Sequence, residues 1–95
     1  MAGQRMTRDE RDLYMRKIAR ADRMRMLRED KGFSQRDLAD LIRVTPLAVA
    51  RWESALSFPQ ARNLRKLAAL YGVSIVFLRT GLNEVQDPYQ RRNSG

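Results

Sequence analysis

Residues 34–54 of the chain, SQRDLADLIRVTPLAVARWES, decide the fold. Polar residues that cap helices well stand directly before two apolar stretches, which predicts helices over residues 35–42 and 46–54. The second helix begins with Pro46, whose missing N–H removes no hydrogen bond at the first helical position. The sequence therefore predicts two short helices joined by a tight turn. Their N-caps are Ser34 and Thr45.

The apolar positions give each of these helices an inner face. In the second helix, Val49 and Trp52 lie near one another and face inward, which leaves the opposite side exposed. In the first helix, the expected inner residues are Leu38, Ala39, Leu41 and Ile42.

A longer helix is expected before this pair. Thr7 and Glu10 form a capping box that starts a helix near residue 8, and Gly32 ends it. The sequence leaves open whether this helix breaks near residues 20–22. On a continuous helix, one apolar stripe contains Leu13, Met24 and Leu27.

Two helices are expected after the pair. Leucine spacing predicts a helix over residues 60–71, which Gly72 ends. Ser74 caps a short last helix that Gly81 closes. The apolar residues of this helix are too dense for an element that is buried on one side only, which favours a homodimer interface. The expected interface residues are Ile75, Val76 and Phe77.

The composition points to an anionic partner. The chain has 19 Lys and Arg against 11 Asp and Glu, with no His and no Cys, so its net charge is +8. The missing Cys and His remove disulfides, thiolate zinc sites and the commonest general base. We therefore expect no metal, no cofactor and no enzyme activity. The charge alone suits DNA, RNA or an acidic protein equally well.

Length and hydropathy bound the organisation of the chain. Its 95 residues fit one small domain, here expected over residues 21–81. A basic arm or helix extension over 1–20 precedes it, and a tail over 82–95 follows. No apolar run approaches the ~18 residues that span a bilayer, and no targeting segment is recognisable. We expect a soluble cytoplasmic, nucleoid-associated protein with no membrane partner.

The stretch from residue 25 to 81 resembles the Cro/CI-type, or XRE, helix-turn-helix family. The resemblance is specific because it rests on an ordered series of capping, apolar and turn positions. It implies an all-α, five-helix lambda-repressor-like domain whose third helix enters the DNA major groove. The matching pieces are LREDKGFSQRDLADLI (27–42), VTPLAVARWE (44–53), Pro59, LRKLAALYGVS (64–74) and FLRTG (77–81).

The resemblance implies a sequence-specific DNA-binding transcriptional regulator. In particular it favours a repressor that binds an inverted-repeat operator in double-stranded DNA as a homodimer. It also implies a structural ion pair between Arg28 and Glu53, which would fix the helix over residues 46–54 against the long helix that begins near residue 8. The expected DNA-binding residues are Gln35, Arg36, Arg43, Thr45, Pro46, Leu47, Ala50 and Arg51.

The chain departs from the family pattern on the surface that would read DNA. Relatives usually carry polar side chains where this chain has Pro46, Leu47, Ala48 and Ala50. Arg51 alone is clearly able to bind a base edge, most naturally guanine O6 and N7. Direct readout is therefore expected to be thin.

Two turn glycines of the family pattern are also missing. Arg43 and Ala55 occupy those positions, and a left-handed backbone at either one costs roughly 1 kcal/mol.

These departures leave an alternative function open. The chain would then be a protein-binding module on the same fold, such as an antirepressor or an antitoxin, that docks its partner on an apolar patch. The patch would contain Pro46, Leu47, Ala50, Leu56 and Phe58. The role of the basic segment 1–20 is also open. It would either contact DNA, at phosphates or in a minor groove, or form a helix face exposed to solvent.

Overall fold

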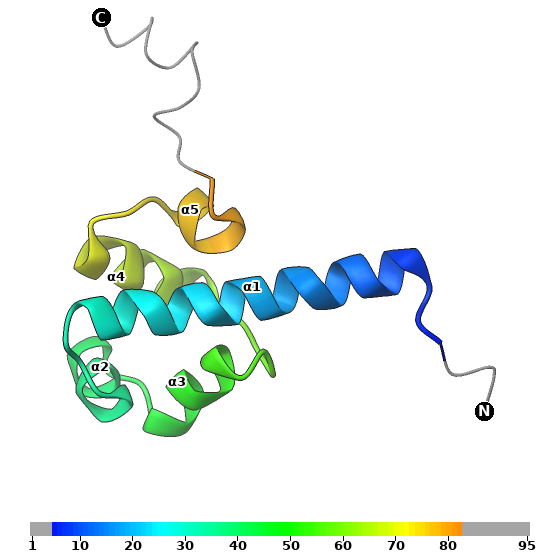
Figure 1. Cartoon of the computed structure of the whole chain (residues 1–95). Coiled ribbons are helices and arrows are strands. Elements are labelled where there is room, and N and C mark those ends of the chain that lie inside the picture. The colour runs from blue at the N-terminus through cyan, green and yellow to red at the C-terminus, as the bar shows by residue number, and fades with distance from the viewer. Residues whose placement is uncertain (1–4, 83–95) are drawn as a thin grey trace, which may run out of the picture.

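The computed structural model describes residues 5–82, and these residues form five helices and no strand. Figure 1 shows a long α1 that crosses the molecule, with α2 and α3 on one side of it and α5 on the other. The predicted all-α, five-helix architecture is confirmed, and each predicted helix end lies within one residue of the observed one. The helices are α1 (Arg8–Asp30), α2 (Gln35–Ile42), α3 (Pro46–Glu53), α4 (Ala61–Tyr71) and α5 (Ile75–Thr80).

Helix α1 is continuous, which settles the question of a break near residues 20–22. The predicted capping box forms, because Thr7 Oγ1 accepts from the N–H of Glu10 at 3.1 Å and Glu10 Oε1 accepts from the N–H of Thr7 at 2.8 Å. At the other end, Gly32 takes a left-handed φ of 77° and its N–H donates to the carbonyl of Glu29 at 2.9 Å. One helix therefore crosses the expected boundary between the segments 1–20 and 21–81.

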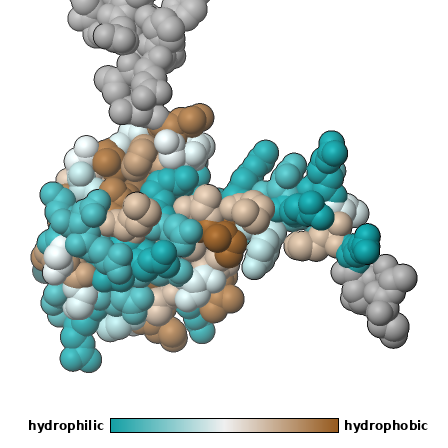
Figure 2. Space-filling model, in the orientation of Figure 1, coloured by the Kyte–Doolittle hydropathy of each residue, from teal (hydrophilic) through white to brown (hydrophobic). Residues whose placement is uncertain are grey.

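The amino-terminal half of α1 extends beyond the other helices (Figure 1). Leu13 is 53% exposed and Tyr14 is 52% exposed, although Leu13 shares the apolar stripe of the buried Met24. The physical reason is that the helix extends past the domain body, so that among residues 5–82 no other helix covers its inner face there. Hydrophilic side chains dominate this half, with apolar ones among them (Figure 2).

The core lies where α1, α4 and α5 meet the α2–α3 pair. Helix α2 buries Leu38, Ala39 and Ile42, but Leu41 is 55% exposed and was wrongly expected inside. Leu41 lies about 100° around the helix from the centre of the buried face, on a side that the described residues leave largely uncovered. The buried hydrophobic cluster consists of Met24, Leu38, Ala39, Ile42, Val49, Trp52, Leu64, Leu67, Tyr71 and Leu78.

The turns on both sides of α3 adopt the conformation that the missing glycines imply. Arg43 has φ 62° and Ala55 has φ 64°, so both non-glycine residues are left-handed, each at a cost of roughly 1 kcal/mol. The N–H of Arg43 donates to the carbonyl of Ala39, which closes α2. The Nζ of Lys66 donates to the carbonyl of Ile42 at 2.8 Å and adds a second cap from α4.

The expected tail lies, apart from Leu82, outside the described residues. Across residues 5–82, no helix has the length and apolar character that a bilayer span requires. The same part of the chain contains no group of three or more Asp or Glu side chains arranged to hold a metal ion.

Candidate nucleic-acid interface

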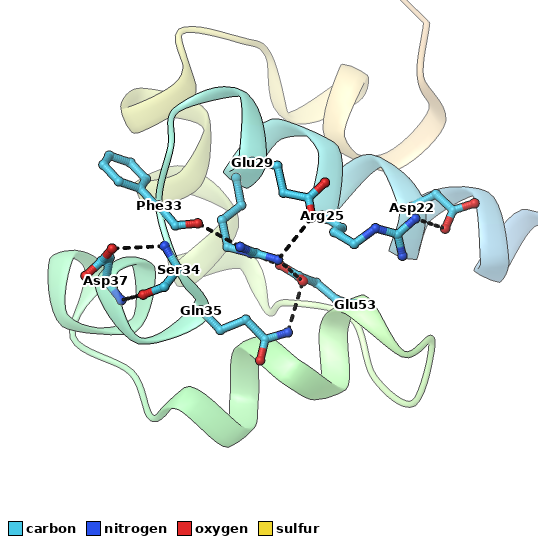
Figure 3. A network of polar contacts seen from close by, with 9 residues as sticks. Asp22, Arg25, Glu29, Phe33, Ser34, Gln35, Asp37 and Glu53 are labelled. Atoms are coloured by element: carbon cyan, nitrogen blue, oxygen red, sulfur yellow. Dashed lines mark hydrogen bonds and ion pairs between the residues drawn. The ribbon is translucent and has the colours of Figure 1, made fainter.

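Helix α3 is held from behind by a buried ion pair, drawn in Figure 3. Arg28 on α1 donates from Nε to Glu53 Oε2 at 2.7 Å and from Nη2 to Glu53 Oε1 at 2.9 Å. Its Nη1 donates to the carbonyl of Phe33 at 2.7 Å. One guanidinium therefore ties the last residue of α3 to α1 and to the loop before α2.

The two charges of this pair are withdrawn from water. The Arg28 side chain is 10% exposed and the Glu53 side chain is 4% exposed. Hydrogen bonding to Glu53 raises the pKa of Arg28, against the opposing effect of burial. A two-hydrogen-bond guanidinium–carboxylate geometry fixes both distance and orientation. The structure thus brings together the two residues that the sequence pairs.

Gln35 belongs to the same network, which the sequence did not predict. Its Nε2 donates to Glu53 Oε1 at 3.1 Å, and Figure 3 shows its carbonyl oxygen pointing away from that carboxylate. We call Arg28, Glu53 and Gln35 the α3 brace. The brace fixes the Gln35 amide at the start of α2, and this contact does not use its acceptor oxygen.

The remaining expected DNA contacts lie on the outer side of α2, the turn and α3. Leu47 is 58% exposed, while Ala50 is partly covered. Thr45 Oγ1 accepts from the N–H of Ala48 at 3.1 Å, so this hydroxyl caps α3. The exposed members of the expected set are Arg36, Arg43, Thr45, Pro46, Leu47 and Arg51.

The amino-terminal ends of α2 and α3 differ in charge. Asp37 in the first turn of α2 accepts from the N–H of Ser34 at 2.9 Å, and hydrogen bonds from Ser34 lower the pKa of Asp37. This carboxylate already occupies the positive end of α2. The first turn of α3 contains no acidic residue. An incoming phosphate therefore meets less repulsion at α3 than at α2.

Two of the three expected dimer residues are used inside the chain. Ile75 packs against the core, and Phe77 is partly buried beneath the guanidinium of Arg23, which lies 6.0 Å from the ring centre. Val76 remains 42% exposed. The apolar residues of α5 thus contribute to the fold of a single chain, and an interface is not needed to explain Ile75 and Phe77.

The apolar patch of the alternative hypothesis likewise contains both exposed residues and residues that other side chains cover. Leu56 is 75% exposed and Leu47 is 58% exposed. Phe58 is partly covered by the guanidinium of Arg20, 4.3 Å from its ring centre. No sequence signal links Arg20 to Phe58, because the contact joins two segments that only the tertiary fold brings together.

Comparisons with known proteins agree with this arrangement. A family model described as helix-turn-helix matches residues 24–78. A curated protein of Bacillus subtilis (strain 168), an SPbeta prophage-derived uncharacterized HTH-type transcriptional regulator named YonR, is 33% identical over 60 residues. That match covers 63% of this chain and 56% of the relative, so the chain spans a little over half of the relative's length. No solved structure matches the chain. The five helices, the braced α3 and the family match together establish that the chain belongs to the helix-turn-helix family, as the Cro/CI-type resemblance predicts.

Proposed function

We propose that this chain is a DNA-binding transcriptional regulator that inserts α3 into the major groove of double-stranded DNA. The observation that carries this proposal is the α3 brace, which holds the inner side of α3 and leaves its outer side toward solvent. An α-helix of ordinary width fits the ~12 Å major groove. The name of the Bacillus relative, a transcriptional regulator, supports the same function.

Phosphate contacts supply most of the proposed affinity. Arg36 and Arg43 are exposed beside α3, and the whole chain has a net charge of +8. Each neutralised phosphate contributes about 0.9 to the slope of log affinity against log salt. The first turn of α3, with no acidic residue, adds a favourable position for one phosphate.

Base recognition depends mainly on Arg51 in this proposal. Arg51 is the one side chain on the exposed side of α3 whose guanidinium matches guanine O6 and N7. Leu47 and Ala50 are suited to contact thymine methyl groups. Because this readout is thin, specificity requires a second half-site or DNA shape.

A homodimer on an inverted repeat supplies that second half-site, and a repressor is the regulator that this arrangement favours. We assign its interface to α5, where Val76 is exposed beside Ile75 and Phe77. The half-sites are then expected about one helical turn, roughly 34 Å, apart. Such a protein would act in the cytoplasm on nucleoid DNA, with no cofactor.

Selection from a random duplex library at two salt concentrations tests the proposal. We expect an enriched inverted repeat, and an affinity that falls with salt in proportion to the phosphates contacted. Arg43→Ala should weaken binding to all sequences alike, whereas Arg51→Ala should relax one base position in each half-site. A library that enriches no motif would contradict sequence-specific binding.

A protein-binding role on the same surface is the second candidate. Its supporting observation is the exposure of Leu47 at 58% and of Leu56 at 75%, which is unusual for a surface that meets only DNA. Leu47→Asp should then abolish a stoichiometric complex with a protein partner. Retention of that complex by the variant would exclude this surface as the docking site.

A further inference from the structure

Four arginines surround one surface pocket between α1 and α5. The pocket has a volume of about 460 Å³, and no carboxylate of the described residues lines it. Within residues 5–82, none of these arginines forms an ion pair. The lining residues are Arg16, Ala19, Arg20 and Arg23 from α1 and Arg79 and Thr80 from α5.

Packing fixes Arg23 at the floor of this pocket. Its Nη1 donates to the carbonyl of Leu78 at 3.1 Å. Gly81 takes φ 75°, and a Cβ atom at that position would lie 2.6 Å from Arg23 Nη2. Glycine is therefore favoured here by the left-handed backbone, and a larger residue would also require the Arg23 guanidinium to shift. A guanidinium has five N–H donors, so most of those on Arg23 are not used by Leu78.

Arg20 is fixed in a different way. Its guanidinium stacks over the ring of Phe58 at 4.3 Å, and its buried Nε has no hydrogen-bond partner among the described residues. A stacked guanidinium keeps its in-plane edge available for acceptor oxygens. Burial lowers the pKa of Arg23, and the positive charge of Arg20 lowers it further. The described part of the chain thus holds two like charges close together, and neither forms an ion pair within it.

We propose that this pocket binds an oligophosphate group of a soluble ligand. Two guanidinium groups with partners inside the chain and two exposed ones supply many donors, which suits the many oxygens and multiple negative charges of a di- or triphosphate. A single carboxylate would leave most of this positive charge uncompensated. The volume also lies within the range of about 300–1,000 Å³ that is usual for ligand pockets.

The position of the pocket separates this ligand from DNA bound to α3. Figure 1 shows α3 and α5 on opposite sides of α1, and the pocket lies on the α5 side. A duplex along the outer side of α3 therefore lies away from Arg79 on α5, whereas Arg20 also contacts Phe58 in the loop that follows α3. The inference does not depend on the proposed function, because an oligophosphate can be measured without DNA.

Isothermal titration with sodium tripolyphosphate at constant ionic strength tests the inference. The wild-type chain should bind one tripolyphosphate. The double variant Arg16→Gln/Arg79→Gln should weaken binding roughly tenfold or more, since charge-assisted hydrogen bonds are lost. Both side chains are exposed, so the fold should persist, which thermal unfolding checks.

A charge-matched control separates a built site from general attraction to a basic protein. The variant Arg62→Gln/Arg65→Gln removes two exposed arginines of α4 and the same formal charge. It should retain near wild-type affinity for tripolyphosphate. Equal affinities of the two double variants, or no saturable binding by the wild type, would overturn the inference. Displacement of tripolyphosphate by a short DNA duplex would also overturn it, because the four arginines would then belong to the DNA-binding surface.

Discussion

The two sides of α3 differ in how far the rest of the chain constrains them. On the inner side, Val49 is fully buried, Trp52 is 6% exposed, and Glu53 is held by two partners. On the outer side, Leu47 and Arg51 are exposed. Packing inside the chain therefore restricts which residues can occupy the inner side. On the outer side, the choice of residues is restricted by the ligand that binds there. This difference explains how a chain can keep the family's architecture while its outer surface departs from the family's polar pattern.

The difference also separates stability from affinity. Substitutions on the inner side should lower the free energy of unfolding. They should weaken DNA binding only because less of the protein is folded. Substitutions on the outer side should change affinity and leave unfolding nearly unaltered. Variants on the two sides of α3 therefore test this separation.

Removing the acidic partner of the α3 brace should have the largest effect. Glu53→Ala leaves the buried Arg28 guanidinium without its two hydrogen bonds to a carboxylate, and only the exposed Glu29, 3.9 Å away, remains as a counter-charge. Breaking a buried pair in this way typically costs about 3–5 kcal/mol. Urea denaturation followed by circular dichroism measures this loss. The double variant Arg28→Met/Glu53→Leu removes both charges and should recover most of the stability. A loss below about 1 kcal/mol for Glu53→Ala would mean that the pair behaves as a solvated surface pair.

The matching change on the outer side is Arg51→Ala. It should weaken binding to the selected operator by about 1–3 kcal/mol and alter the free energy of unfolding by no more than about 0.5 kcal/mol. Fluorescence anisotropy and urea denaturation of the same variant measure the two quantities. Arg62→Ala on α4 is the control for loss of one exposed positive charge. Equal weakening on all duplexes would identify Arg51 as a phosphate contact.

Tyr71 tests the inner side through pH. Burial raises the pKa of the Tyr71 phenol to about 12, and the negative charge of Glu53 contributes in the same direction. The neutral phenol is thus favoured in the folded state. Its contribution is complete below pH 10, the ordinary pKa, and is lost as pH rises through 12. We expect this group to remove about 1–2 kcal/mol of stability over that interval.

The variant Tyr71→Phe isolates this effect. It should lack that part of the alkaline loss, whereas Tyr14→Phe, at an exposed position on α1, should retain it. At neutral pH, Tyr71→Phe should not be destabilising, because the Tyr71 hydroxyl is buried and has no partner among the described residues. Identical pH profiles for the two variants would contradict the assignment to Tyr71.

The comparison of the two sides also shows what sequence can predict. Helix ends follow from local signals, and the capping hydroxyls of Ser34, Thr45 and Ser74 each accept from the N–H three residues later. Val49 and Trp52 follow from helical periodicity. These predictions succeed because capping and amphipathicity involve residues within one or two turns of each other.

The errors and omissions have the opposite origin. The exposure of Leu13 depends on where neighbouring helices end, which no local pattern encodes, whereas Leu41 lies off the buried face of its own helix. The contact of Arg23 with the carbonyl of Leu78 spans 55 positions in the sequence. The participation of Gln35 in the α3 brace likewise requires α3 to be placed against α2. The arginine pocket was missed for the same reason, since its residues come from two ends of the chain.

The smallest predicted effect concerns the two left-handed turns, one at each end of α3. Ala55→Gly should stabilise the fold by about 0.5 kcal/mol, because relief of the left-handed strain exceeds the added freedom of the unfolded chain. Arg43→Gly should stabilise the fold to a similar extent and, unlike Ala55→Gly, weaken DNA binding, because Arg43 is exposed beside the DNA-reading side of α3. Thermal unfolding and anisotropy on both variants check this. If Arg43→Gly leaves affinity unchanged, Arg43 serves only the turn, and the outer surface does not extend beyond α3 in that direction.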